Sequence, residues 1–180
     1  MQMRLPLKGW RQAFLMSMSL AATVLILASA PLPTVAAPGP IGVSQNGRYG
    51  YPITPLLVRR QAYYTCLAGG FHGYGHNDSW RGKPRWRGAL DDPAAQQVTI
   101  LKNVFTGLSE WWTLVPDQTV LTTGGNAKGD VLNLSARSAT GQWIIAYIAD
   151  HPDITVNWAT VTAADSASAK WINPATGSQV

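Results

Sequence analysis

The chain has little of the chemistry that would support disulfides or paired carboxylates. Cys66 is the only cysteine among 180 residues, so the chain has no internal disulfide framework. It lies in an apolar helical stretch, and we interpret it as an inert buried thiol rather than a nucleophile. Glu110 is the only glutamate.

Long apolar runs are also absent, except near the N-terminus. Three basic residues precede an apolar run at residues 14–30 (FLMSMSLAATVLILASA), and small residues follow it. This order is typical of a secretory signal peptide, which we expect at residues 1–37 with cleavage after Ala36 or Ala37. The run is about 17 residues, near the lower limit for a membrane span. We expect a secreted or periplasmic protein, attached to a membrane only if the segment is not cleaved.

The leader accounts for much of the positive charge. The whole chain has 14 Lys and Arg against 9 Asp and Glu, and three of the basic residues precede the apolar run. The mature chain would keep 11 against 9. Its basic residues are interleaved with Gly, Pro and Trp rather than clustered. We therefore expect no nucleic-acid partner.

The rest of the chain divides into a helical part and a strand-rich part. Residues 38–53 are rich in proline and glycine and predict a linker or arm. A helix is predicted from Thr54 as N-cap to a stop at Gly69-Gly70. A second helix is predicted after Asp91 or Asp92, because Pro93 can occupy its first turn and apolar residues then recur at helical spacing. Four strands are expected at 130–138, 141–149, 154–161 and 169–173, with Thr140-Gly141 in a hairpin turn.

The stretch FHGYGHNDSW at residues 71–80 carries the most distinctive chemistry. We expect a short strand at 71–75 that runs into a polar loop continuing to Leu90. Aromatic rings can stack on sugar C–H faces, and planar polar side chains can bind sugar hydroxyls, so the stretch suits carbohydrate contact. The alternative is structural: the tryptophans pack the loop, and His76 and Asp78 form hydrogen bonds within it. Because glycines flank His76 on a loop expected to be exposed, function is the favoured interpretation for this residue.

Several motifs, in order, resemble the C-terminal end of the apiosidase-like glycoside hydrolase catalytic domain. They are RRQAYYTCLAGGFHGYGHNDSW, WRGALDDPAAQQVTILKNVF and WWTLVPDQ. The following ATGQWIIAYIAD, ITVNW and AKWINPATG resemble a small β-sandwich appended to those enzymes and labelled a collagen-binding domain. The resemblance spans roughly residues 57–176. It implies an α/β fragment, the last βα units of a TIM barrel, at residues 54–117. A small antiparallel β-sandwich-like domain, itself incomplete, would follow at residues 118–180.

The resemblance also implies a position for the loop. Residues 54–68 would form the helix before the eighth barrel strand, 71–75 that strand, 76–90 its loop and 93–108 the closing helix. Loops that follow the strands form the active site of such barrels. With Trp86, whose chemistry also suits sugars, the expected substrate-binding residues are His72, Tyr74, His76, Asn77, Asp78, Trp80 and Trp86.

The carboxylates of the family are missing. Family members carry both on earlier strands, one of them in a Gly-Glu segment before the Arg-Arg-Gln-Ala-Tyr motif, but the corresponding APGPIGVSQNGRYGYPIT contains no acid. We interpret the chain as a truncated, inactive relative with no cofactor, for which plant or extracellular polysaccharide is the expected partner. One alternative is a non-catalytic secreted module that binds carbohydrate or matrix protein. A more remote one is an iron-dependent oxygenase that uses His76, Asp78 and His151. We expect Trp111-Trp112 to pack between the two parts.

Overall fold

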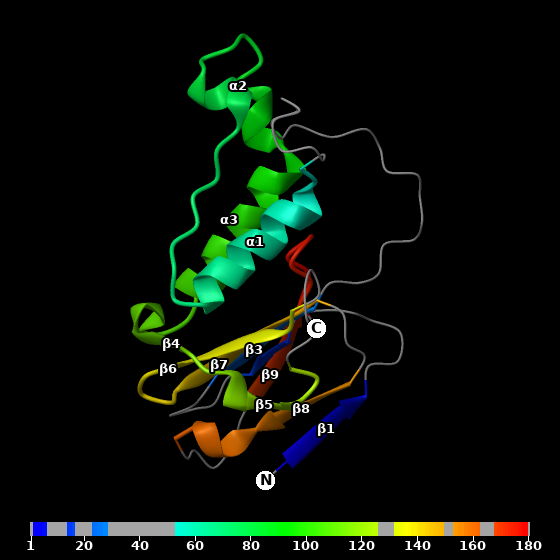
Figure 1. Ribbon diagram of the computed structural model, residues 1–180, viewed down its shortest axis with the longest axis vertical. Coiled ribbons are helices and arrows are strands. Elements are labelled where there is room, and N and C mark those ends of the chain that lie inside the picture. Colours follow the sequence, from blue (N-terminus) through cyan, green and yellow to red (C-terminus); the bar gives the residue numbers. More distant parts are fainter. Residues whose placement is uncertain are drawn as a thin grey trace.

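The computed structural model describes residues 2–6, 14–16, 23–28, 53–125, 132–149, 153–162 and 168–179. Two helices, α1 (Pro55–Leu67) and α3 (Pro93–Thr106), cover one face of a larger sheet, and a smaller sheet lies on its other face (Figure 1). A third helix, α2 (Asn77–Trp80), lies at the end of the molecule farthest from the sheets. The shorter 3₁₀ turns are η1 (Gly88–Asp91), η2 (Trp111–Thr113), η3 (Gln118–Val120) and η5 (Trp158–Thr160).

The two sheets are mainly antiparallel. The smaller sheet has the strand order β1-β8-β5 and the larger one β2-β9-β3-β7-β6-β4. Only β3 runs parallel to its neighbours β7 and β9. The strands are β1 (Gln2–Pro6), β2 (Phe14–Met16), β3 (Thr23–Ala28), β4 (Leu114–Pro116), β5 (Leu121–Thr123), β6 (Leu134–Ser138), β7 (Trp143–Ile148), β8 (Asp153–Asn157) and β9 (Ser168–Ile172).

Both predicted helices are confirmed, with their capping residues. The Thr54 hydroxyl accepts a hydrogen bond from the Leu57 amide at 3.2 Å, and the Asp92 carboxylate accepts one from the Ala94 amide at 3.2 Å. Each cap precedes a proline at the first helical position, where the missing N–H removes no helical hydrogen bond. The Asp92 cap lies where the segment that carries the predicted site joins α3, whereas the Thr54 cap lies at the opposite end of α1 from that segment.

Strand β7 is the centre of the molecule, because it is buried on both faces. Trp143, Ile145 and Tyr147 point toward the helices, and the alternate residues Ile144, Ala146 and Ile148 point toward the smaller sheet. Tyr63 of α1 stacks on Tyr147, with ring centroids 4.7 Å apart. The helical part and the strand-rich part therefore share a continuous core.

The predicted hairpin is confirmed as the β6–β7 pair. Its register places Ala136 opposite Ile145, and Gly141 in the turn has a φ of 71°, which favours glycine. All four predicted strands of this part are present as β6 to β9; β6, β7 and β8 are shorter than expected, and β9 is shifted by one residue toward the N-terminus.

The predicted strand at residues 71–75 is wrong. The backbone there is extended but pairs with no strand, and it runs beside α1 and α3 (Figure 1). Its residues still alternate in exposure. Phe71, Gly73 and Gly75 are exposed, whereas His72, Tyr74 and His76 are less exposed. An alternating pattern shows that one side of the segment is buried, and here two helices, rather than a neighbouring strand or sheet, bury it. In the described residues the fold is a small mixed α/β domain with no closed barrel.

The predicted leader overlaps three short strands. Within residues 1–37, β1 pairs with β8, β2 with β9, and β3 lies between β7 and β9, while the rest of this range and residues 38–52 lie outside the described residues. Leader, linker and division of the chain remain predictions. None of the described helices has the length and apolar character needed to cross a membrane.

Candidate functional site

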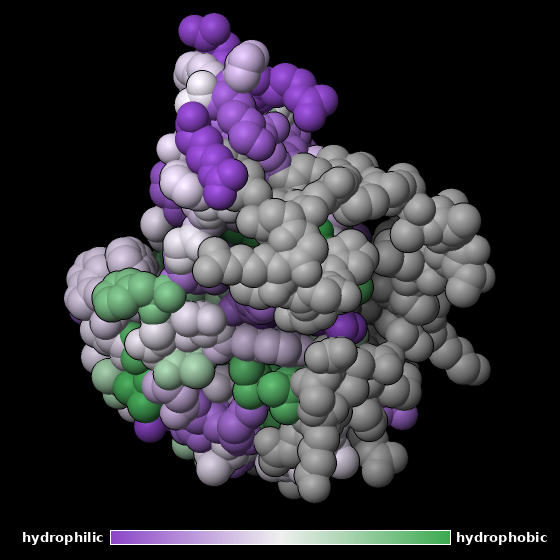
Figure 2. Space-filling view, turned by 45° about the horizontal axis from the view of Figure 1, so that its top comes forward, coloured by the Kyte–Doolittle hydropathy of each residue, from purple (hydrophilic) through white to green (hydrophobic). Residues whose placement is uncertain are grey.

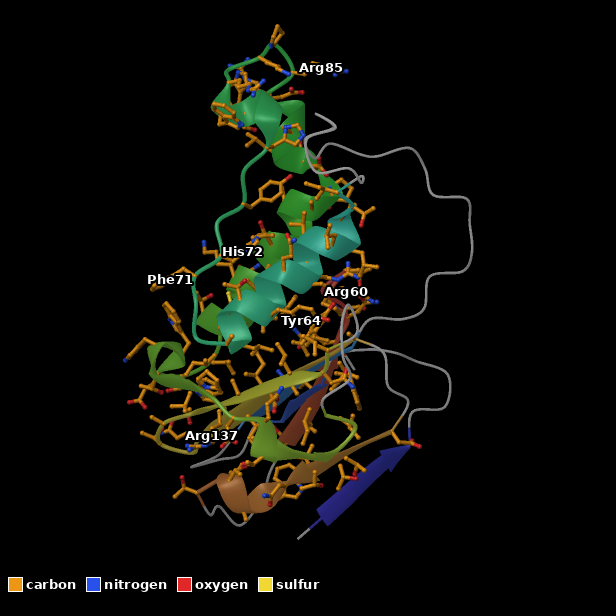
Figure 3. All side chains as sticks on the ribbon, in the orientation of Figure 1. Arg60, Tyr64, Phe71, His72, Arg85 and Arg137 are labelled. Atoms are coloured by element: carbon orange, nitrogen blue, oxygen red, sulfur yellow. The ribbon has the colours of Figure 1, made fainter. Side chains whose placement is uncertain are left out.

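The expected site residues lie on the connection between α1 and α3, which has a buried base and an exposed tip. Gly69, with a φ of 82°, ends α1, and the chain then runs along the two helices to His76. There it turns into α2, makes an exposed loop and returns through η1 to the start of α3. Figure 3 shows His72 on the strand-like stretch beside the helices and Arg85 at the far end of the loop. The segment thus reaches from the body of the molecule to its extremity.

The base of the loop is organised around His76. The imidazole is buried, and its Nδ1 accepts a hydrogen bond from the Asp78 amide at 3.1 Å. The proton of a neutral ring therefore lies on Nε2, which faces Asp92 Oδ2 at 3.6 Å. That distance is too long for a hydrogen bond, and Nε2 is buried with no hydrogen-bond partner among the described residues, so Asp92 acts on the ring through its charge. Asp92 also caps α3, so one carboxylate holds both the loop and the helix.

Tyr74 completes the base from the apolar side. It packs against the small cluster formed by Val58 and Ala94, and its hydroxyl is buried without a hydrogen-bond partner among the described residues. Burial, assisted by the negative charge of Asp92, raises the pKa of Tyr74 to about 12. A phenol in this position stays neutral at any physiological pH. The Tyr74 ring therefore packs in the apolar cluster, and its hydroxyl donates no hydrogen bond to the described residues.

His72 is half-buried on the same side of the chain. Burial lowers the pKa of its imidazole, and its Nε2 has no hydrogen-bond partner among the described residues. Burial also raises the pKa of the neighbouring Cys66 thiol by more than the His72 backbone hydrogen bond lowers it. Both groups are uncharged near neutral pH, which agrees with the interpretation of Cys66 as inert.

The tip of the loop carries two exposed tryptophans. Trp80 is 67% exposed and Trp86 is 37% exposed. The Arg81 guanidinium lies 4.7 Å from the Trp80 ring centroid, and Arg87 lies 4.9 Å from that of Trp86. Figure 2 shows hydrophilic residues gathered over this end of the molecule, whereas hydrophobic ones lie over the sheets. The tip is therefore a cationic and aromatic surface.

The predicted site residues do not form one cluster. His72, Tyr74 and His76 lie inward against the helices, and Trp80 and Trp86 lie outward at the tip. Between them, the Asp78 carboxylate forms an ion pair with Lys83 at 3.2 Å. The side chain of Asn77 lies outside the described part of the structure. The expectation that His76 is exposed is wrong, because the loop folds back and buries the ring beside Asp92.

The carboxylates of the described residues form no catalytic pair. Asp92 is buried and engaged by the Ala94 amide and His76, and Asp78 is paired with Lys83. Glu110 lies beyond the other end of α3, where its carboxylate accepts a 3.5 Å hydrogen bond from the Thr140 hydroxyl. Its φ of 51° is the only positive value at a non-glycine residue in the described ranges. These acids have separate structural partners rather than a shared substrate position.

The described residues offer no metal centre. No group of three or more His, Cys, Asp or Glu among them could hold a metal ion. Of the expected iron ligands, His151 lies outside the described residues, and the two nitrogens of His76 already face the Asp78 amide and Asp92. The arrangement of the base therefore gives the oxygenase hypothesis no support.

Sequence reasoning missed three features of this region. The first is the partnership of His76 with Asp92, which the position of Asp92 after the loop and before Pro93 could have suggested. The second is the repeated Trp-Arg-Gly at residues 80–82 and 86–88, whose arginines stack on the preceding rings. The third is the exposure of Trp111 and Trp112. The expectation that they pack between the two parts is wrong, since Trp112 is 70% exposed and the pair meets edge to face.

Comparison with known proteins identifies no family. The chain matches no protein-family model, and no curated protein matches it.

Proposed function

We propose that the chain is an exported, non-catalytic carbohydrate-binding protein and a truncated relative of the apiosidase-like glycoside hydrolases. The observation that carries the binding function is the exposure of Trp80 and Trp86 on a projecting loop. Large exposed aromatic side chains at one end of a soluble domain mark an interaction site. Aromatic rings are suited to sugars, because they stack on the C–H faces of the pyranose ring.

The anchoring of the loop supports this function. His76 and Tyr74 fix its base on α1 and α3. A rigid base lowers the conformational entropy that the loop would lose on binding. The proposal is non-catalytic because Asp78, Asp92 and Glu110 each contact a different structural partner.

The test combines an activity assay with a binding assay. We expect the purified chain to release no product from aryl glycosides, and turnover above the background of a denatured sample would refute the non-catalytic assignment. In affinity gels containing soluble polysaccharides, we expect Trp80→Ala to weaken binding about tenfold, equivalent to about 1.4 kcal/mol.

The matched control is Trp112→Ala. Trp112 is 70% exposed, close to the 67% of Trp80, but it lies in η2, away from the loop. Its removal is expected to leave binding unchanged. Equal effects of the two substitutions would show general stickiness of exposed tryptophan, and no effect of Trp80→Ala would remove the tip from the binding site.

A further inference from the structure

The charge of the tip is more specific than its aromatic content. Arg81, Lys83, Arg85 and Arg87 lie within seven successive positions, and all four are exposed. Lys83 is paired with Asp78, whereas no described carboxylate forms an ion pair with any of the three arginines. Asp78 is half-buried, and Asp91, at the foot of the loop, is exposed. The tip therefore has three guanidinium groups that no carboxylate of the described residues neutralises.

The arginines are held in a repeated arrangement. In each Trp-Arg-Gly unit the guanidinium lies over the ring of the preceding tryptophan, at 4.7 Å for Arg81 and 4.9 Å for Arg87. Such stacking reduces the freedom of a long side chain and leaves its N–H groups available at the edge. A planar guanidinium binds carboxylate or sulfate through two parallel hydrogen bonds. Each unit thus offers an aromatic ring that can stack on a sugar and a guanidinium group that can bind an anionic substituent.

From this arrangement we infer that the ligand of the tip is an acidic polysaccharide, with carboxylate or sulfate groups spaced along a sugar chain. The inference rests on the proposed carbohydrate-binding function and narrows it from sugars in general to polyanionic ones. Neutral polysaccharide would use the rings and leave three cations without partners. An acidic chain would use the rings and the cations together.

The composition of the apex argues against a lipid surface. Between the two Trp-Arg-Gly units lie only Lys83, Pro84 and Arg85, so no large apolar side chain stands at the point of the loop. Figure 3 shows Arg85 at that point, and Figure 2 shows the same end as hydrophilic. Insertion into a bilayer interface needs buried apolar area in addition to charge. The apex itself carries two cations and a proline, and the exposed rings of Trp80 and Trp86 lie on either side of it in the sequence.

The experiment compares two polymers with one backbone. Carboxymethylcellulose carries carboxylates and hydroxyethylcellulose does not. We expect the full chain to bind carboxymethylcellulose at least tenfold more tightly in affinity gels, with the difference shrinking as salt is raised. The double variant Arg81→Gln/Arg87→Gln should lose at least tenfold in affinity for carboxymethylcellulose. Its unfolding midpoint in urea should match that of the parent chain, because both arginines are exposed.

The matched control removes two charges elsewhere. Lys102 on α3 and Lys170 on β9 are exposed, and Lys102→Gln/Lys170→Gln should change affinity less than twofold. An equal loss in this variant would mean general ion exchange and would overturn the inference. The variant Arg81→Lys/Arg87→Lys keeps the two charges but not the planar guanidinium groups. We therefore expect its affinity for carboxymethylcellulose to lie between those of the parent chain and the Arg81→Gln/Arg87→Gln variant.

The failures of the two proposals are distinguishable. Equal binding to both celluloses, still weakened by Trp80→Ala, would overturn the acidic ligand and leave carbohydrate binding intact. No binding to either cellulose or to any other soluble polysaccharide would overturn both. Tighter binding to anionic phospholipid vesicles or to a single-stranded oligonucleotide than to carboxymethylcellulose would assign the tip to another class of polyanion.

Discussion

The contact between Asp92 and His76 gives a quantitative test of how the loop is anchored. Asp92 caps α3 through the Ala94 amide, and its second oxygen faces His76 Nε2 at 3.6 Å. Thr54 caps α1 through the Leu57 amide and has no such second role. Asp92→Ala therefore removes a cap and a loop contact, whereas Thr54→Ala removes a cap alone.

The expected magnitudes follow from these roles. Loss of an N-cap costs about 1 kcal/mol of stability. Loss of the partner of a buried polar group costs about 1 to 3 kcal/mol, and we take the lower end because 3.6 Å is longer than a hydrogen bond. Asp92→Ala should thus lower the free energy of unfolding by about 2 kcal/mol, and Thr54→Ala by about 1 kcal/mol. Asp92→Asn keeps the cap, so it should lose only the contact with His76.

Urea unfolding followed by tryptophan fluorescence measures these differences. With a slope of about 2 kcal/mol per molar urea, a difference of 1 kcal/mol moves the midpoint by about 0.5 M. In a His76→Ala background, Asp92→Asn should have almost no effect, because the partner is already gone. The reasoning is refuted if Asp92→Ala costs no more than Thr54→Ala, or if Asp92→Asn has the same effect with and without His76.

Three further predictions concern pH and backbone conformation. Because burial raises the pKa of Tyr74 to about 12, the stability that this phenol contributes is complete below about pH 10 and is lost as pH rises through 12. Tyr74→Phe should therefore remove one late-ionising tyrosine from the absorbance titration near 295 nm, where the buried Tyr63 also ionises late. Loss of a tyrosine that ionises near pH 10 instead would refute the assignment. Burial alone would raise the pKa of Asp117, but hydrogen bonds from Thr119 and Arg137 outweigh this effect and lower that pKa. Arg137→Met should therefore lower the free energy of unfolding by about 1.5 kcal/mol at pH 7, and by less near pH 3, where Asp117 is protonated. An equal loss at both pH values in urea unfolding would contradict the ion-pair explanation. Gly124 has a φ of 77°, and a Cβ there would lie 2.5 Å from the Asp153 carbonyl oxygen, so Gly124→Ala should lower the free energy of unfolding by about 2 kcal/mol or more. Gly73 has open space around it, so Gly73→Ala should leave the urea midpoint nearly unchanged. Similar midpoints for the two variants would refute the argument.

The sequence was most informative where the determinants of structure are local. Helix α1 and helix α3 begin where a cap precedes a proline, and the β6–β7 turn lies at Gly141, because these features depend on neighbouring residues. The strand predicted at 130–138 is present as β6, but the side chains that it and the residue before it bury are partly polar, with Asn133 and Ser135 buried and Leu134 half-buried. The Asn133 side chain is buried because it donates to the Gly124 carbonyl and accepts from the Ala149 amide. Those partners are distant in sequence, so the pattern alone could not identify them.

The candidate site shows the same limit. Residues 71–75 alternate like a strand, yet the surface that buries them consists of two helices, and sequence periodicity cannot distinguish the two cases. The chemistry of the tip was partly predictable, since Trp80 and Trp86 were selected as sugar-contacting residues. Their stacking with Arg81 and Arg87 was not selected, although the repeated Trp-Arg-Gly was visible in the sequence.

The division between base and tip explains why one short stretch contains two kinds of chemistry. His76 contacts the Asp92 carboxylate, which also caps the first turn of α3. The loop therefore leaves and rejoins the helical layer at the same point, and the segment between is short and closed at its base. A loop closed in this way loses less entropy when its tip binds a ligand than one attached only through its chain ends. The histidine that looked like a ligand-binding residue is thus better explained as a positioning residue, and the recognition chemistry begins with Trp80 and Arg81.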